Sequence, residues 1–287
     1  MARLTYLSRC LRLFLALAAS PSTAGAAEAR LPIFDTHMHY SEPAWSAYPP
    51  EAVLAAMRQA GVARAVVSST PDDGTLKLLA ADGQRFVPEL RPYRGTVGSG
   101  NWTADAATPG YLEARLARTR YFGIGEFHLH GADDDVSEVV LATADLALAH
   151  DIPLHVHAGA APVEALFAAR PALKILWAHA GMSSPAAEVA RLFDRHAKLW
   201  AELSFRAADV APGGRIDDEW RALLLRHAGR FMIGTDTYVT GRWADYAGLI
   251  EAHRAWLVQL PTDAAERIAW RNAAALYGDG GLAELKP

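Results

Sequence analysis

Short apolar runs alternate with longer amphipathic segments from residue 31 onward. Apolar residues that recur at helical spacing predict helices, whereas the short runs predict strands. The predicted strands are residues 33–40, 64–70, 86–93, 122–130, 153–158, 173–179, 198–205 and 230–236. The predicted helices are residues 51–60, 109–120, 136–150, 161–170, 185–196, 218–228, 242–258 and 262–277. Strand–helix alternation repeated eight times predicts an α/β fold of the (β/α)8 TIM barrel type.

An open, doubly wound sheet is the alternative architecture. Such a sheet usually carries a Gly-rich turn that binds phosphate, and the nearest candidate is Gly98-Ser99-Gly100. This stretch lacks both a following Lys-Ser/Thr pair and a third spaced glycine. The pattern therefore favours the barrel, as a single domain over residues 28–287.

The first 27 residues differ from the rest of the chain. Three arginines precede a short apolar run at residues 13–19, and small residues follow at 22–27. This order is typical of a secretory signal peptide, and the apolar run is too short to span a bilayer. We expect residues 1–27 to direct export, to the periplasm, and to leave no membrane anchor after their removal. The alternative is a mis-assigned start codon.

Composition narrows the classes of function. The formal net charge is −4 and no basic run occurs, so a nucleic-acid partner is not expected. Cys10 is the only cysteine, which excludes disulfides, thiolate metal sites and a cysteine nucleophile. A small-molecule substrate is the expected partner. A homo-oligomer is possible, but no pattern in the sequence encodes it.

Histidines gather within the predicted strands or at their ends. Seven of the eleven histidines lie there: His37, His39, His128, His130, His155, His157 and His179. Glu126 lies on the same face as His128, and Asp236 ends the eighth strand. In a parallel barrel, functional groups come from the carboxyl ends of the strands. The clustering predicts one shared polar site.

The residue types in this cluster favour a metal site. Side chains alternate along a strand, so His37 and His39 point to one face and can bind one ion. Imidazole and carboxylate ligands without thiolate suit Zn²⁺, and also Mn²⁺, Fe²⁺ or Co²⁺. Asp236 can serve both as a ligand and as the base that accepts a proton from water. The alternative is that His37 and His39 make only local hydrogen bonds.

The ordered motifs resemble those of the amidohydrolase superfamily. The matching stretches are Phe34-Asp-Thr-His-Met-His39, Gly123-Ile-Gly-Glu126, Pro153-Leu-His-Val-His157, Trp177-Ala-His-Ala-Gly181, Gly234-Thr-Asp236 and Arg271-Asn-Ala-Ala-Ala-Leu-Tyr277. The resemblance covers about residues 31–278. It is closest to the amidohydrolase-related branch, which also holds decarboxylases similar to aminocarboxymuconate-semialdehyde decarboxylase.

The resemblance implies a ligand set. His37, His39 and Asp236 would bind the more buried metal, and His157 and His179 would complete its shell or hold a second ion. Relatives carry Lys or Glu at the position of Glu126. Glu126 could bridge two metals, as in TatD-type deoxyribonucleases, or lie outside the shell of a single ion. We expect one or two divalent ions, Zn²⁺ first and Mn²⁺ as the alternative, with Asp236 and His179 as catalytic residues.

Other polar residues have less specific signals. Guanidinium groups near a metal would suit a carboxylate- or phosphate-bearing substrate, although they can equally pair with local acids. The predicted substrate-binding residues are His128, Arg91, Tyr93 and Arg242. We expect His155 to be a polar group deeper in the barrel, His130 to lie in a loop, and Asp35 to be a hydrogen-bonded carboxylate beneath the metal.

The predicted function is a metal-dependent hydrolase that acts on an ester, lactone, amide or similar bond of a small molecule. A non-oxidative decarboxylase of a small carboxylated substrate is the alternative from a different reaction class. A non-enzymatic exported barrel that binds metal or ligand is a further alternative. A nuclease is disfavoured, because no basic track for a phosphate backbone is present.

Overall fold

The computed structural model describes residues 30–131 and 136–278. The chain divides into two units, Met1–Arg30 and Leu31–Pro287, and the fold below is that of the second. The predicted export signal, residues 1–27, lies outside the described residues. Within the described residues, no helix is both long and apolar enough to cross a membrane.

The strands are all parallel to their neighbours and form two sheets. The first sheet contains β1 (Ile33–His39), β2 (Val62–Ser68) and β3 (Phe86–Pro88), in that order. The second contains, also in chain order, β4 (Ile124–His128), β5 (Leu154–His157), β6 (Ile175–Trp177), β7 (Leu199–Glu202) and β8 (Phe231–Met232).

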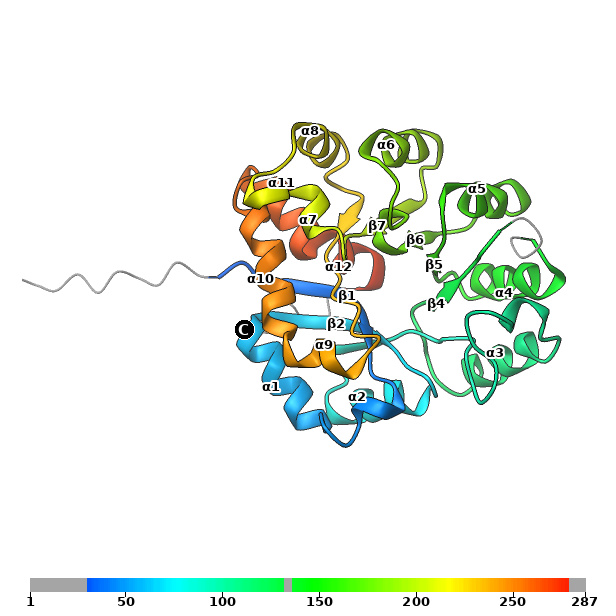
Figure 1. Ribbon diagram of the computed structural model, residues 1–287. Helices are drawn as coiled ribbons and strands as arrows, with labels where there is room; N and C mark the ends of the chain where they lie inside the picture. Colours follow the sequence, from blue (N-terminus) through cyan, green and yellow to red (C-terminus); the bar gives the residue numbers. More distant parts are fainter. Residues whose placement is uncertain (1–29, 132–135, 279–287) are drawn as a thin grey trace, which may run out of the picture. The chain divides into compact units, whose positions relative to one another are not determined.

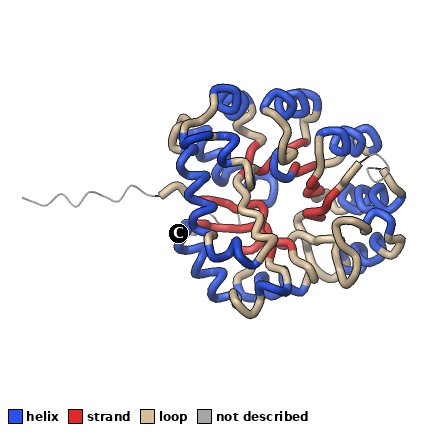
Figure 2. Tube along the Cα trace, viewed as in Figure 1, coloured by secondary structure: helices blue, strands red, loops and turns tan. Residues whose placement is uncertain are grey.

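Single bridges link the two sheets at both seams. Leu90, just after β3, pairs with Ile124 of β4, and Asp35 of β1 pairs with Ile233 beyond β8. The ring of strands is therefore not closed by continuous sheet pairing. Helices lie around the outside of the strands (Figures 1 and 2), which is the α/β arrangement of the predicted barrel.

The helices between the strands follow the predicted order. They are α1 (Pro50–Ala60), α2 (Asp73–Ala81), α3 (Thr108–Leu116), α4 (Glu138–Ala149), α5 (Ala160–Ala169), α6 (Ala186–Arg195), α7 (Ala207–Val210) and α8 (Asp218–Arg226). After β8 come α9 (Thr240–Ala244), α10 (Tyr246–Leu257), α11 (Thr262–Glu266) and α12 (Asn272–Tyr277). The segments predicted as single helices at 242–258 and 262–277 are thus interrupted, the second by a π-helical turn at Arg267–Arg271.

Local signals explain where α1 and α2 begin and end. Pro50 opens α1, and Gly61 ends it with a left-handed φ of 67°. Helix α2 is absent from the predicted helices, because Asp73-Gly74 at its start is typical of a turn. Gly74 is required there, since a Cβ atom would lie 2.0 Å from the carbonyl oxygen of Tyr40.

All eight described strands end before their predicted limits, and in two of them this leaves a site residue outside the strand. The strand predicted at 173–179 ends at Trp177, and the strand predicted at 230–236 ends at Met232. His179 and Asp236 therefore lie in the turns that follow, with left-handed φ values of 56° and 49°. A non-glycine residue in this region cannot continue a strand, and such conformations concentrate at functional sites.

The interior of the ring has an apolar floor. Alternate residues of five strands form a buried cluster separate from the main core between strands and helices, with Ala273 and Tyr277 of α12. The strand residues in this cluster are Phe34, Ala63, Val66, Val87, Leu176 and Met232. The polar residues that build the site lie nearer the carboxyl ends of the strands, as His37 and His39 do on β1.

Candidate metal centre

The first pair of predicted ligands meets directly. Nε2 of His37 lies 3.0 Å from Nε2 of His39, and both side chains are buried. The register of β1 against β2 shifts between Asp35 and Met38, the interval that contains His37, and His39 pairs with Ser68 beyond it. The irregularity lets both imidazoles reach the same point inside the ring.

The other ring nitrogens fix the tautomers of both histidines. Nδ1 of His39 lies 3.0 Å from the carbonyl oxygen of Ser68, which can only accept a hydrogen bond. Nδ1 of His37 lies 3.0 Å from Oε1 of Glu202, a carboxylate oxygen. Each Nδ1 therefore carries the proton, and each neutral ring directs a bare Nε2 at the other. Two lone pairs at this distance need positive charge between them, from a metal ion or from a proton on one of the rings.

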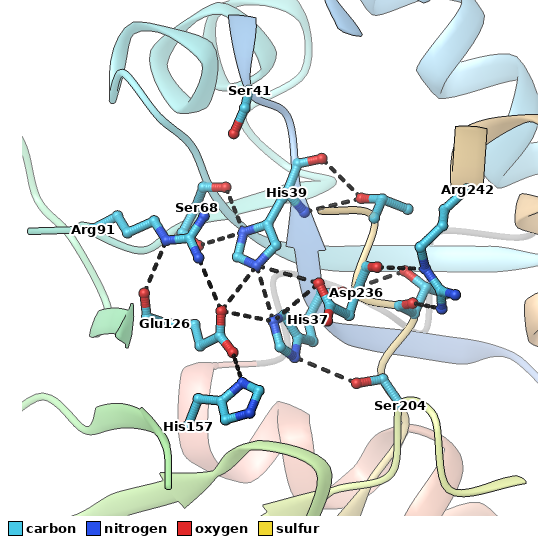
Figure 3. Close-up of polar contacts among 12 residues, drawn as sticks. His37, His39, Ser41, Ser68, Arg91, Glu126, His157, Ser204, Asp236 and Arg242 are labelled. Carbon is cyan, nitrogen blue, oxygen red and sulfur yellow. Dashed lines mark hydrogen bonds and ion pairs between the residues drawn. The ribbon is translucent and has the colours of Figure 1, made fainter. Parts of the chain in front are cut away.

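The carboxylates of Asp236 and Glu126 lie beside the same point (Figure 3), and the imidazole of His179 lies close to Asp236. Oδ1 of Asp236 lies 3.6 Å from Nε2 of His37 and 3.4 Å from Nε2 of His39. Oε2 of Glu126 lies 3.2 Å from Nε2 of His39. Nε2 of His179 lies 3.7 Å from Oδ2 of Asp236.

Unpartnered atoms test whether this group of residues fits a metal ion. Oδ1 of Asp236 and Nε2 of His179 are buried, and neither has a hydrogen-bond partner among the described residues. Buried polar atoms normally have partners, so orphans that surround one point indicate a missing group. Imidazole nitrogens and carboxylate oxygens without thiolate are ligands for Zn²⁺ or Mn²⁺. The residues therefore fit a divalent cation.

The pKa shifts of the site residues also indicate that positive charge is needed at this point. Burial opposes protonation of His37, but the carboxylates of Asp236, Glu202 and Glu126 outweigh it and raise the pKa of His37 well above its usual value. Burial likewise opposes ionisation of Glu126, but neighbouring imidazoles, His37 foremost, hold its pKa well below the usual value. Without a metal, a proton on His37 supplies the missing charge.

Glu126 is already engaged on both carboxylate oxygens. Nη2 of Arg91 donates to Oε2 at 3.0 Å, and Nε of Arg91 donates to the backbone oxygen of Glu126 at 2.9 Å. Nδ1 of His157 lies 2.8 Å from Oε1 (Figure 3). His157 thus contacts Glu126 rather than the facing nitrogens of His37 and His39.

A second group of aromatic side chains lies beside His157. The His128 and His157 rings stack at 4.2 Å, and the backbone N–H of His128 donates to the Tyr93 hydroxyl at 2.8 Å. The Tyr93 hydroxyl lies 2.9 Å from Nδ1 of His128 and donates to it. Burial is the main reason that the pKa of His128 falls to about 3, so this ring is neutral. His128 and His157 are half-buried, which opens the site to solvent on this side.

Arg242 contacts the turn that carries Asp236. Its Nε donates to the backbone oxygen of Asp236 at 2.7 Å, and its Nη2 donates to that of Thr235 at 2.7 Å. The guanidinium lies over the Phe205 ring, 4.0 Å from the centroid. These contacts support the left-handed turn. Substrate binding by Arg91, Tyr93, His128 and Arg242 stays a prediction.

The remaining polar residues lie where the sequence predicts. Nδ1 of His155 lies 2.9 Å from Oε2 of Glu89 in the barrel interior. Asp35 is buried and accepts hydrogen bonds from the backbone N–H groups of His37 and Thr235. His130 is exposed in the loop after β4.

Sequence reasoning missed Glu202, which has no assigned role among the predicted site residues. It is fully buried at the end of β7 and lies between His37 and His179. Its signal is the alternation of Trp200, Glu202 and Ser204, which puts a carboxylate on the inward face of an otherwise apolar strand.

Comparisons with known proteins bear on the family and the fold of the chain. The sequence profile of the family described as Amidohydrolase matches residues 34–278, most of the chain. Comparison with curated protein sequences finds no match.

Solved structures with low sequence identity share the fold. A candidate 2-pyrone-4,6-dicarboxylic acid hydrolase from Pseudomonas putida is 19% identical, with TM-score 0.61 over 86% of this chain and 98% of its own. A 5-carboxyvanillate decarboxylase from Sphingomonas paucimobilis is 14% identical, with TM-score 0.57 over 86% and 99%. The same enzyme type from Novosphingobium aromaticivorans, solved with manganese and a nitrobenzoic acid, is 12% identical, with TM-score 0.56 over 87% and 97%.

These structures support the (β/α)8 fold, and the profile covers the segments that carry the site residues from His37 to Asp236. The resemblance seen in the sequence motifs is thereby confirmed. The chain belongs to the amidohydrolase family.

Proposed function

We propose that this protein is a metal-dependent hydrolase that cleaves an ester, lactone, amide or similar bond of a small molecule. The observation that carries the proposal is the pair of bare Nε2 atoms of His37 and His39, 3.0 Å apart and surrounded by carboxylates. Such an arrangement needs positive charge between the two atoms, from a metal ion or, without one, from a proton on His37. Family membership supports it, because amidohydrolases are metal-dependent and a structural neighbour holds manganese.

We further propose a single ion, Zn²⁺ first and Mn²⁺ as the alternative. Its ligands would be His37, His39 and Asp236, with His179 able to complete the shell. A carboxylate that bridges two ions uses both oxygens, whereas those of Glu126 already contact Arg91 and His157. Binding of His157 to the ion, or a second ion at Glu126, would require these contacts to break.

When bound, the ion would lower the pKa of a water molecule and polarise the bond to be cleaved. Asp236 would bind the ion through Oδ1, which has no hydrogen-bond partner among the described residues, and its second oxygen, Oδ2, could then accept the proton of the water. His179 directs a bare Nε2 into the same space, so it can hold or return a proton at that atom. Arg91 donates a hydrogen bond to Glu126 and orients its carboxylate beside His39.

Decarboxylation of a small carboxylated substrate is the second candidate. Arg91 supports it, because its guanidinium lies next to the ligand group and suits a substrate carboxylate. The fold shared with the 5-carboxyvanillate decarboxylases supports it at the level of architecture alone.

The test is a substrate screen of the Zn²⁺ and Mn²⁺ forms in ¹⁸O-labelled water. Incorporation of one labelled oxygen into product, without release of carbon dioxide, is the expected result. Carbon dioxide release without incorporation would replace hydrolase with lyase, and a metal-loaded protein without turnover would support the non-enzymatic alternative. The proposal that the protein acts in the periplasm rests on residues 1–27 and is tested by N-terminal sequencing of the exported chain.

A further inference from the structure

One buried carboxylate, that of Glu202, contacts two residues of the site at once. Its Oε1 lies 3.0 Å from Nδ1 of His37 and 3.4 Å from Nδ1 of His179. The hydroxyl of Ser204 donates to the same oxygen at 3.1 Å, and the backbone N–H of Ser204 donates to Oε2 at 2.7 Å. These donors occupy the acceptor sites of the carboxylate.

Glu202 also supports the strained turn that carries His179. The backbone N–H of His179 donates to Oε1 at 2.6 Å, and His179 has a left-handed φ of 56°. A non-glycine residue in this conformation persists only where the surroundings hold it. Ser204 completes the arrangement, because its hydroxyl lies 2.7 Å from Nδ1 of His179.

Close packing fixes the position of this carboxylate. A Cβ atom at Gly234 would lie 2.0 Å from Oε2 of Glu202 and 2.8 Å from Cβ of His37. The side chain is 0% exposed, so water does not compete for its hydrogen bonds. The lack of a side chain at position 234 is what allows strands β7 and β8 to bring Glu202 against His37.

We propose that Glu202 is the positioning residue of the metal centre, which sets the tautomer of His37 and the backbone of His179 together. This inference rests on the proposed function, since it assumes that His37 binds an ion. An ionised carboxylate accepts the Nδ1 proton of His37 and keeps Nε2 bare for the ion. Without the negative charge of Glu202, His37 is no longer held in the tautomer that carries its proton on Nδ1.

The test compares Glu202→Gln with Glu89→Gln in the full chain. An amide at position 202 carries an N–H group in place of one carboxylate oxygen. Where this N–H faces Nδ1 of His37, Nδ1 must accept a hydrogen bond, and the ring proton moves to Nε2. Glu89 is the matched control, because it is equally buried and pairs with His155, which lies outside the proposed ligands. Affinities for Zn²⁺ and Co²⁺ are measured by chelator competition, together with the visible spectrum of the Co²⁺ form.

We expect Glu202→Gln to bind both ions about 10–100-fold more weakly than wild type, with an altered Co²⁺ spectrum. Glu89→Gln should retain the wild-type affinity within about threefold and the wild-type spectrum. If Glu202→Gln does not fold, Ser204→Ala provides the readout, because it removes one hydroxyl from the same network. Ser204→Ala should weaken binding and alter the spectrum in the same direction.

Two results would overturn the inference in distinguishable ways. Wild-type affinity and spectrum in Glu202→Gln, or in Ser204→Ala where that is the variant that folds, overturn the positioning role alone. A wild-type protein that binds neither ion overturns the proposed function, and the positioning role with it.

Discussion

At the scale of single residues, the positions of the imidazole protons decide which nitrogen atoms can bind a cation. The Ser68 carbonyl and the Glu202 carboxylate hold the Nδ1 protons of His39 and His37, so both Nε2 atoms are bare. Asp236 adds an oxygen without a donor at the same point. A cation at this point would satisfy all three atoms, and we propose Asp236 as the group that accepts a proton from water.

Asp236→Asn is the prediction that belongs to this scale. The amide keeps the shape of the side chain but cannot act as a base, so we expect turnover to fall by about 10²–10⁴-fold. The free energy of unfolding should also fall, by about 1–3 kcal/mol, because the ionised side chain pairs with His37 and His39 and is a proposed ligand. The measurements are kcat on any substrate from the screen and urea unfolding.

Asp218→Asn is the control for this change, because its side chain is 87% exposed and its one ion pair among the described residues is with Arg215. It should leave both kcat and stability unchanged. Turnover by Asp236→Asn at close to the wild-type rate would show that another group is the base.

At the scale of elements, alternation along strands predicts most of the site. The period of two places His37 and His39 together on β1, and His155 one layer below His157 on β5. It could not predict that β6 and β8 end before His179 and Asp236, because these left-handed turns depend on contacts with Glu202 and Arg242. These contacts come from residues distant in sequence.

The seam between β1 and β8 depends on side chains as well as on backbone pairing. Besides its backbone donors, Asp35 accepts hydrogen bonds from the hydroxyls of Thr235 at 2.6 Å and Tyr246 at 2.9 Å. Burial is the main cause that raises the pKa of Asp35 to about 6, against the effect of these donors. Each donor therefore matters to the stability of the seam.

We predict that Tyr246→Phe lowers the free energy of unfolding by about 1–3 kcal/mol, because Asp35 loses a donor that water cannot replace. Urea unfolding at pH 7.5 is the measurement. Tyr238→Phe is the control, since Tyr238 is 57% exposed, and it should change stability by less than about 0.5 kcal/mol. Equal stability of Tyr246→Phe and wild type would mean that the seam does not depend on this hydrogen bond.

At the scale of the whole unit from residue 31 onward, the strand–helix alternation predicts the barrel, and the shared fold of solved structures supports it. Local sequence patterns could not predict the two seams between the sheets. Each consists of a single bridge, and each is set by contacts between residues far apart in the chain. The outer helices also contact the ring beside such a seam, as His253 of α10 illustrates. Its Nε2 donates to the backbone oxygen of Gly234 at 3.1 Å.

His253 gives a prediction for the stability of the whole unit against pH. Burial lowers the pKa of His253 from 6.5 to about 4, so the unfolded chain binds a proton at a higher pH than the folded chain. Its contribution to stability is therefore complete above pH 6.5 and declines as the pH falls toward 4. The loss amounts to about 3 kcal/mol at pH 4.

The measurement is the free energy of unfolding of wild type and His253→Gln between pH 7.5 and pH 4. Gln can still donate to Gly234 but does not titrate in this range. We expect the stability difference between the two proteins to shift in favour of the variant by about 3 kcal/mol as the pH falls. A difference that stays constant with pH would show that His253 does not titrate on unfolding.

The metal content of the purified protein tests the proposed site most directly. We predict about one divalent ion per chain by elemental analysis after gentle purification, and its loss in the double variant His37→Ala/His39→Ala. Removal of the ion from wild type by a chelator should abolish turnover and lower the melting temperature, and Zn²⁺ or Mn²⁺ should restore both. The contrary result is a wild-type protein that carries no metal and whose melting temperature does not change when Zn²⁺ or Mn²⁺ is added. That result would contradict a metal site at His37 and His39.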